Sequence, residues 1–291
     1  MSDPDVSGLD VPLSHLAPAE KAERAATFGL EASHYEHYRP GPPAAAVDWL
    51  LPARVARVVD LGAGTGGLTR LLVDRADDVV AVEPDDRMRA VLSSEMPGIQ
   101  AVKGRGESIP LPSGCADAVV ASSSWHWMDP VPTIREVGRV LVPGGILGAV
   151  WSGPDPEGAF VVQAQALLVE QDHNRAAEAA TGGEGDGADN LTSLIMGDAA
   201  RPRSTLEIPV GVPFSQPEHE LFTWEVALNA DDLVGLLGTF SWFIMMEEKT
   251  RQRVFSEARR LLRELLGVEG DVTVDVAFRC DAYRSQLLSS R

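Results

Sequence analysis

The hydrophobic pattern between residues 44 and 151 alternates between two kinds of segment. Short, nearly continuous apolar runs are typical of buried parallel strands, and the segments between them place apolar residues three or four positions apart, as amphipathic helices do. The expected strands are Val55–Leu61, Val79–Val82, Ile99–Val102, Ala116–Ala121 and Ile146–Trp151, and the expected helices are Ala44–Leu51, Leu68–Leu72, Met88–Leu92 and Ile134–Leu141. Pro143-Gly144-Gly145 is expected to stop the last of these helices. The alternation predicts an α/β fold, with a parallel sheet covered on both faces.

The regular alternation ends after Trp151. A helical pattern runs from Phe160 to Val169, and residues 176–190 are rich in Ala, Gly, Glu and Asp. Because the centre of that stretch has no apolar stripe, we expect a mobile loop there.

Order returns near Pro202, and residues 219–291 again contain strand and helix patterns. Leu221–Val226 and Val272–Phe278 are expected strands. Asn229 is expected to cap a short helix, and a longer amphipathic helix is expected to end before Gly267.

Charge and composition limit the classes of partner. The 291 residues have a formal net charge of −18, which argues against nucleic acid and anionic membranes because both attract basic surfaces. No apolar run is long enough to span a bilayer. The acidic start, Met-Ser-Asp-Pro-Asp, is unlike a secretory signal, and two cysteines are too few for a disulfide framework, so we expect a cytoplasmic protein. The histidines lack metal-ligand spacing, and no metal is expected.

The most informative motif is the glycine-rich turn Asp60-Leu61-Gly62-Ala63-Gly64-Thr65-Gly66, directly after the first strand. Glycines permit a tight turn and close approach of a ligand to the backbone. The next helix begins there with free N–H groups, at the edge of the sheet where open α/β sheets bind ligands. The motif therefore predicts a ligand site.

Two kinds of cofactor fit this turn. Gly62–Gly67 also satisfies GxGxxG, the fingerprint of dinucleotide sites, which alone is a weak signal. Glu83 ends the second strand and suits either cofactor, since both have ribose hydroxyls. Asp60 would repel a pyrophosphate but would suit the ammonium group of a methionine moiety. The residues alone leave both kinds of cofactor open and favour the one that contains a methionine moiety.

Taken together, the motifs resemble the class I S-adenosylmethionine-dependent methyltransferases, and within them the small-molecule group of trans-aconitate methyltransferase-like enzymes. The segments that carry the resemblance are Val58–Gly66, Val82-Glu83-Pro84 with Met88, Gly106–Pro110, Ala116–Val120, Trp125-His126-Trp127 and Arg139–Gly145. The resemblance covers residues 28–151 well and residues 219–285 more loosely. It implies a doubly wound, mostly parallel, seven-stranded Rossmann-like sheet with an antiparallel last strand and an inserted helical cap.

The resemblance also implies a role for each residue of the cofactor site. Asp60, Gly62, Gly64, Thr65 and Gly66 would face the methionine and ribose of S-adenosylmethionine. Glu83 would bind the ribose hydroxyls, with Pro84 and Met88 packed on adenine and Gly106 and Glu107 at its amino edge. Ser122 would offer a backbone carbonyl to the methionine amine, and Tyr38 and Arg39 would bind the methionine carboxylate. Arg105 departs from the pattern, because many relatives have Asp there.

The acceptor side of the site has fewer signals. His126 is the best-placed general base, unless its ring instead bonds the backbone and shapes the loop. Trp125, Trp127, Phe240 and Trp242 are expected to line the pocket for a small-molecule acceptor, methylated at oxygen. Residues 1–43 would form an arm and lid, 44–151 the cofactor-binding core, 152–218 an acceptor cap, and 219–291 the rest of the sheet.

Three hypotheses follow from the sequence. The first is a small-molecule methyltransferase, with S-adenosylhomocysteine as its second product. The second is a nicotinamide- or flavin-dependent oxidoreductase that uses the same glycine turn. The third is a protein that binds S-adenosylmethionine without catalysis.

Overall fold

The computed structural model describes residues 38, 40–51, 53–164, 166, 205–239, 248–267 and 269–289. The chain forms two compact units. Among the described residues, the larger unit takes those between 38 and 153, between 205 and 223, and from 279 onward. The smaller unit takes those between 154 and 166 and between 224 and 278.

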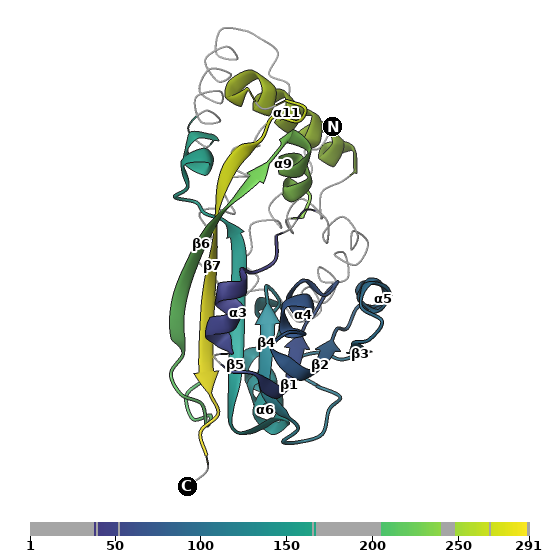
Figure 1. The fold of residues 1–291 in the computed structure, drawn as a ribbon, viewed down its shortest axis with the longest axis vertical. Helices are drawn as coiled ribbons and strands as arrows, with labels where there is room; N and C mark the ends of the chain where they lie inside the picture. Colours follow the sequence, from purple (N-terminus) through teal and green to yellow (C-terminus); the bar gives the residue numbers. More distant parts are fainter. Residues whose placement is uncertain are drawn as a thin grey trace, which may run out of the picture. The chain divides into compact units, whose positions relative to one another are not determined.

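Seven strands form one sheet in the order β3-β2-β1-β4-β5-β7-β6 (Figure 1). They are β1 (Val55–Leu61), β2 (Ala76–Val82), β3 (Gln100–Val102), β4 (Ala116–Ser122), β5 (Leu141–Pro154), β6 (Glu218–Leu228) and β7 (Val274–Gln286). The pairs β3–β2, β2–β1, β1–β4 and β4–β5 are parallel. The order reverses beside β1, which places a ligand-binding switch point at its carboxyl end.

The last strand, β7, runs antiparallel to β5. The Gly144 amide donates to the Leu287 carbonyl at 3.0 Å, and the Leu287 amide donates to the Gly145 carbonyl at 2.8 Å, so the start of β5 lies beside the end of β7. The predicted seven-stranded α/β fold with an antiparallel last strand is therefore confirmed.

The Pro143-Gly144-Gly145 segment corrects one sequence-based expectation. The preceding helix ends earlier, at Val140, and β5 begins at Leu141 rather than at Ile146. The pairing with β4 shifts between Leu141 and Ile146, which marks a β-bulge. Gly144 adopts a φ of 82°, so the glycines form an irregularity inside the strand.

Helices cover both faces of the parallel part of the sheet. They are α3 (Ala44–Leu50), α4 (Gly67–Leu72), α5 (Asp86–Glu95) and α6 (Pro130–Val140). Helix α6 packs on the face that carries Val59 and Leu147. Leu50 of α3 packs against Gly148 instead, and neighbouring strand residues point to opposite faces, so α3 lies on the other side.

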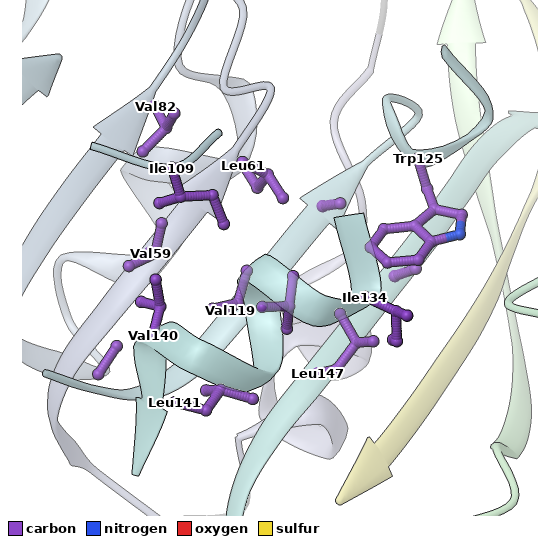
Figure 2. Close-up of a cluster of buried hydrophobic side chains, with 14 of the residues drawn as sticks. Val59, Leu61, Val82, Ile109, Val119, Trp125, Ile134, Val140, Leu141 and Leu147 are labelled. Carbon is purple, nitrogen blue, oxygen red and sulfur yellow. The ribbon is translucent and has the colours of Figure 1, made fainter. Parts of the chain in front are cut away.

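The core of the larger unit lies between α6 and the sheet. Figure 2 shows Ile134 and Val140 of α6 gathered with Val59, Val119 and Leu147 of three strands. All five side chains are almost fully buried. Burying such a side chain stabilises the fold by roughly 1.5–3 kcal/mol, so this cluster fixes the parallel strands and the loops at their ends.

The smaller unit contains α9 (Ala230–Leu237) and α11 (Glu248–Leu266) beside its ends of β6 and β7. Residues 159–164 are also helical. Phe278 and Val276 of β7 pack there with Leu233 and Leu236 of α9. The expected cap of α9 is confirmed, because the Asn229 side chain accepts from the amides of Asp231 and Asp232. No helix among the described residues is both long and apolar enough to cross a membrane.

Strand β7 buries a short polar segment inside the larger unit. The guanidinium group of Arg279 forms two hydrogen bonds with the Asp281 carboxylate, at 2.9 and 3.0 Å, and both side chains are 9% exposed. Cys280 lies between them and is fully buried. Burial raises the pKa of the Cys280 thiol to about 11.

Candidate functional site

The glycine turn after β1 is held in a shape that requires glycine. Gly62, Gly64 and Gly66 have φ angles of 71°, 58° and 101°, values that side chains with a Cβ rarely adopt. A Cβ on Gly62 would lie 2.6 Å from the Ser124 Cβ. Gly66 precedes the first turn of α4. The turn therefore brings three glycines, whose backbone is not covered by a side chain, to the carboxyl edge of the sheet.

Asp60 is a fully buried carboxylate directly before this turn. Its Oδ2 accepts a 2.6 Å hydrogen bond from the Thr69 hydroxyl of α4. Its Oδ1 is buried and has no hydrogen-bond partner in the part of the chain that the structure describes. Burial, with repulsion from Glu83, raises the pKa of Asp60 to about 7. An unpartnered buried oxygen is costly, so a hydrogen-bond donor from a ligand would stabilise this atom.

Glu83 directly follows β2 and is also buried, at 5% exposure. Its Oε2 accepts from the Gly64 amide and its Oε1 from the Asp85 amide, both at 2.8 Å. Burial raises the pKa of Glu83, while these two amides lower it. The bond to Gly64 joins the acidic end of β2 to the glycine turn, so the two predicted motifs meet in space.

Pro84 and Met88 follow Glu83 beside the same turn. Pro84 is exposed, and Met88 is nearly buried on α5. A Cβ built on Gly64 would lie 3.9 Å from the Met88 sulfur, so the thioether borders the turn. Asp85 caps α5 by accepting from the amides of Arg87 and Met88. The cap fixes Met88 next to the glycine backbone.

The loop after β4 is tied to the end of β1. The buried Ser124 hydroxyl donates to the Leu61 carbonyl at 2.7 Å. Ser123 has a φ of 49°, the only positive value of a non-glycine residue in the described chain. Such strain persists where the surroundings enforce it and is common at functional sites. Ser123 lies between Ser124 and the half-buried Ser122, whose carbonyl was predicted to face the ligand.

Gly106 and Glu107 support the same loop from the other side. Gly106 is buried, and a Cβ there would lie 2.5 Å from the Met128 sulfur. Glu107 accepts a 2.8 Å hydrogen bond from the Asp129 amide, just before α6. Arg105 is exposed. These two predicted residues thus position the loop that follows β4.

Trp125-His126-Trp127 forms the short 3₁₀ helix η3 in that loop. Trp125 is buried in the core cluster beside Ile134 (Figure 2), whereas His126 and Trp127 are half-buried. Of the two tryptophans expected to line the acceptor pocket, Trp125 is therefore a packing residue of the core. The indole N–H of Trp151, on β5, donates to the His126 Nδ1 at 3.0 Å.

A row of side chains continues from Trp151 along β7. The Trp151 ring meets Tyr283 edge to face at 5.8 Å, and Tyr283 stacks on His219 at 4.5 Å. The His219 Nε2 lies 2.9 Å from the carboxylate of Asp281, which binds Arg279. The row gives the Trp151 indole a second neighbour besides His126.

Comparison with known proteins assigns the chain to a family. A family model described as a methyltransferase domain matches residues 59–149, which include the glycine turn, Glu83, η3 and most of β5. An uncharacterized methyltransferase of Mycobacterium tuberculosis is 37% identical over 242 residues, which are 83% of this chain and 88% of that protein. The chain belongs to the class I S-adenosylmethionine-dependent methyltransferases.

One further relative and one solved structure are also similar to this methyltransferase. A malonyl-[acyl-carrier protein] O-methyltransferase of Enterobacter lignolyticus is 34% identical over 136 residues, which are 45% of this chain and 54% of that one. A solved structure named as a type II methyltransferase from Anaeromyxobacter dehalogenans has a TM-score of 0.56 at 22% identity, covering 87% of this chain and all of that one. The similarity to this solved structure confirms the fold.

The residues present fit S-adenosylmethionine. Asp60 has a buried oxygen without a donor, and the methionine ammonium is a cationic donor. The positive φ angles of Gly62, Gly64 and Gly66 keep this backbone free of a Cβ at three positions, which permits close approach of a ligand. Glu83, which accepts from the Gly64 amide, suits the ribose hydroxyls. The methyltransferase therefore has carboxylate acceptors that match the amino and ribose groups.

Several predicted residues lie outside the described residues, namely Arg39, Phe240, Trp242 and the loop 176–190. Tyr38 is described and half-buried, and Thr65 is buried in the turn. Among the residues that the structure describes, no cluster of His, Cys, Asp and Glu has the arrangement of a metal site.

Sequence analysis of the methyltransferase missed three residues of this site: Thr69, Ser124 and Trp151. Thr69 holds the Asp60 carboxylate and Ser124 ties two loops together. Trp151 was recognised only as the end of a strand. Its position in β5, directly after the strand residues that pair with β4, was the signal that it lies at the ligand-binding edge.

Proposed function

We propose that this methyltransferase transfers the methyl group of S-adenosylmethionine to an oxygen atom of a small-molecule acceptor. The observation that carries the proposal is the unpartnered, buried Oδ1 of Asp60 beside a glycine turn that is bonded to Glu83. Support for oxygen comes from the name of the Enterobacter relative, an O-methyltransferase. The net charge of −18 supports a small acceptor over nucleic acid.

Each end of the methyl donor has residues to hold it. Asp60 accepts from the methionine ammonium, and the Ser122 carbonyl accepts from the same group. Glu83 accepts from the ribose hydroxyls. Pro84, which is exposed, and Met88, beside the turn, pack on the adenine ring. Tyr38 and Arg39 bind the methionine carboxylate.

The protein's main catalytic task in this reaction is alignment. S-adenosylmethionine supplies an activated methyl group on a sulfonium centre. The chain's residues hold the donor and acceptor in line, and such positioning is worth roughly 7–11 kcal/mol of the barrier. Among the described residues, the half-buried Trp127 and His126 of η3 are the ones we assign to the acceptor.

Calorimetric titration with S-adenosylhomocysteine tests the cofactor half of the proposal. Asp60→Asn and Glu83→Gln keep the shape of each side chain but remove its charge. Each is expected to weaken binding by about 1–3 kcal/mol, or roughly 5- to 150-fold. The matched control is Glu95→Gln, at an exposed position in the last turn of α5, which should leave the affinity unchanged. Unchanged affinity in both site variants would refute the assigned site.

A product-mass screen tests the acceptor half. The 291-residue enzyme is incubated with S-adenosylmethionine and a panel of carboxylic acids, phenols, amines and thiols. The proposal expects products 14 mass units heavier, as one CH₂ is gained, among the oxygen acceptors. Products confined to amines or thiols would contradict oxygen as the acceptor atom while leaving the cofactor site intact.

A further inference from the structure

The hydrogen bond between Trp151 and His126 fixes which ring nitrogen of His126 carries the proton. An indole N–H is only a donor, so the His126 Nδ1, 3.0 Å away, accepts and is unprotonated. A neutral imidazole has one proton, which must then be on Nε2. The bond thus selects one of the two neutral tautomers.

This tautomer is unsuited to general-base catalysis. A base needs an unprotonated nitrogen, and Nδ1 is the only such atom in the ring. Taking up a proton there would break the bond from Trp151 and leave two N–H groups facing each other at 3.0 Å. Nε2 already carries a proton and has no lone pair to accept another.

The position of Trp151 is itself fixed by its neighbours. Its ring packs against the core cluster and meets Tyr283 edge to face. Tyr283 stacks on His219, which lies 2.9 Å from Asp281. On the other side, η3 begins at the buried Trp125, so the backbone that carries His126 is anchored in the core. Neither partner turns away without disturbing packed groups.

We propose that Trp151 is a positioning residue of this methyltransferase, holding His126 as the Nε2–H tautomer, which meets the acceptor as a hydrogen-bond donor and not as a general base. The inference rests on the proposed function, because it assigns His126 to the acceptor side. It implies that the acceptor either needs no deprotonation or loses its proton to another group. Trp151 acts only through His126.

Nitrogen NMR of the full-length protein tests the tautomer directly. The protein is labelled with ¹⁵N in its histidine rings and saturated with S-adenosylhomocysteine, and His126→Gln identifies the His126 signals. The expected spectrum has a protonated Nε2 and an unprotonated Nδ1. A protonated Nδ1 in the wild-type protein at neutral pH overturns the proposal, and no acceptor is required for this result.

Trp151→Phe removes the donor and keeps an aromatic ring. In this variant the Nδ1–H tautomer should become populated, while affinity for S-adenosylhomocysteine stays unchanged. The control is Trp49→Phe, on α3, whose ring lies under Arg284 at 4.3 Å and which should leave the His126 signals unaltered. A wild-type tautomer in Trp151→Phe contradicts the positioning role, and the unchanged affinity shows that the variant is folded.

Two substitutions of His126 separate donation from base catalysis. Gln has an amide N–H to donate but takes up no proton, and Ala does neither. With an acceptor found in the mass screen, donation predicts that kcat of His126→Gln stays within about threefold of wild type while His126→Ala falls roughly tenfold. Equal losses of about 10²–10⁴-fold in both variants indicate a base. Failure of every acceptor would contradict the proposed function, whereas the NMR result would stand.

Discussion

Asp60 couples proton binding to binding of the methyl donor. Burial, with repulsion from Glu83, raises the pKa of this carboxyl to about 7, so near neutral pH it is partly protonated in the free protein. A cationic ligand favours the carboxylate. We therefore expect S-adenosylmethionine to release protons on binding at pH 6.5, and its affinity to increase from pH 6 to pH 8.

Calorimetry in two buffers with different heats of ionisation measures that proton release. Asp60→Asn, which has no proton to lose, is the control and should bind with weaker, nearly pH-independent affinity. An identical number of released protons in the wild type and in Asp60→Asn would show that another group titrates.

Gly62 offers a second test at the scale of one residue. Gly62→Ala places a Cβ 2.6 Å from Ser124 at a φ of 71°, so it should destabilise the protein by about 2–4 kcal/mol. Gly67→Ala is the matched control, because a Cβ at Gly67 meets nothing within 4 Å at the start of α4. Its unfolding free energy in urea should be unchanged or about 1 kcal/mol higher. Equal stability of both variants would contradict the close approach of the two loops.

Single residues differ in how far the sequence reveals them. Asp60 and Glu83 are found from the sequence because each lies at the end of a recognisable strand and the glycine turn lies between them. The bond from Trp151 to His126 joins residues 25 positions apart on β5 and η3, and it depends on how the two elements pack. Local patterns carry no record of such packing.

At the scale of elements, α9 has a capping box that is testable by itself. Asn229 accepts from two amides, and the Asp232 side chain accepts from the Asn229 amide at 3.1 Å. Asn229→Ala should lower the free energy of unfolding by about 1 kcal/mol. Asn229→Asp retains an acceptor and should be close to wild type. A loss of the same size in Asn229→Asp would assign the effect to something other than the cap.

Most elements follow from their local pattern, and the exceptions have a common cause. β1 has the predicted bounds, because its apolar run is bordered by turn residues. β5 starts five residues earlier than predicted, since Leu141 pairs with Ala116 of β4, and Gly144 and Gly145 bond to Leu287, just past the end of β7. β7 likewise extends to Gln286, beyond its apolar run. Pairing partners, which decide these ends, are distant in sequence.

At the scale of the whole molecule, the net charge of −18 opposes the compact state through self-repulsion. Raising NaCl from about 0.02 to about 0.5 M shortens the screening distance severalfold. The thermal midpoint should rise by about 2–4 °C for each kcal/mol of repulsion removed. Near pH 4.7, the sequence pI, the same salt series should have little effect. An equal rise at both pH values would point to a general salt effect.

The buried Cys280 thiol of β7 allows local unfolding of the protein to be measured by chemical labelling. Cys280 is fully buried with a pKa of about 11, whereas Cys115 is partly exposed. An alkylating reagent at pH 8 thus labels Cys115 promptly and reaches Cys280 only when β7 separates from the residues that cover it. The labelling rate of Cys280, measured by mass spectrometry, therefore reports how often β7 opens, and no probe has to be added to the chain.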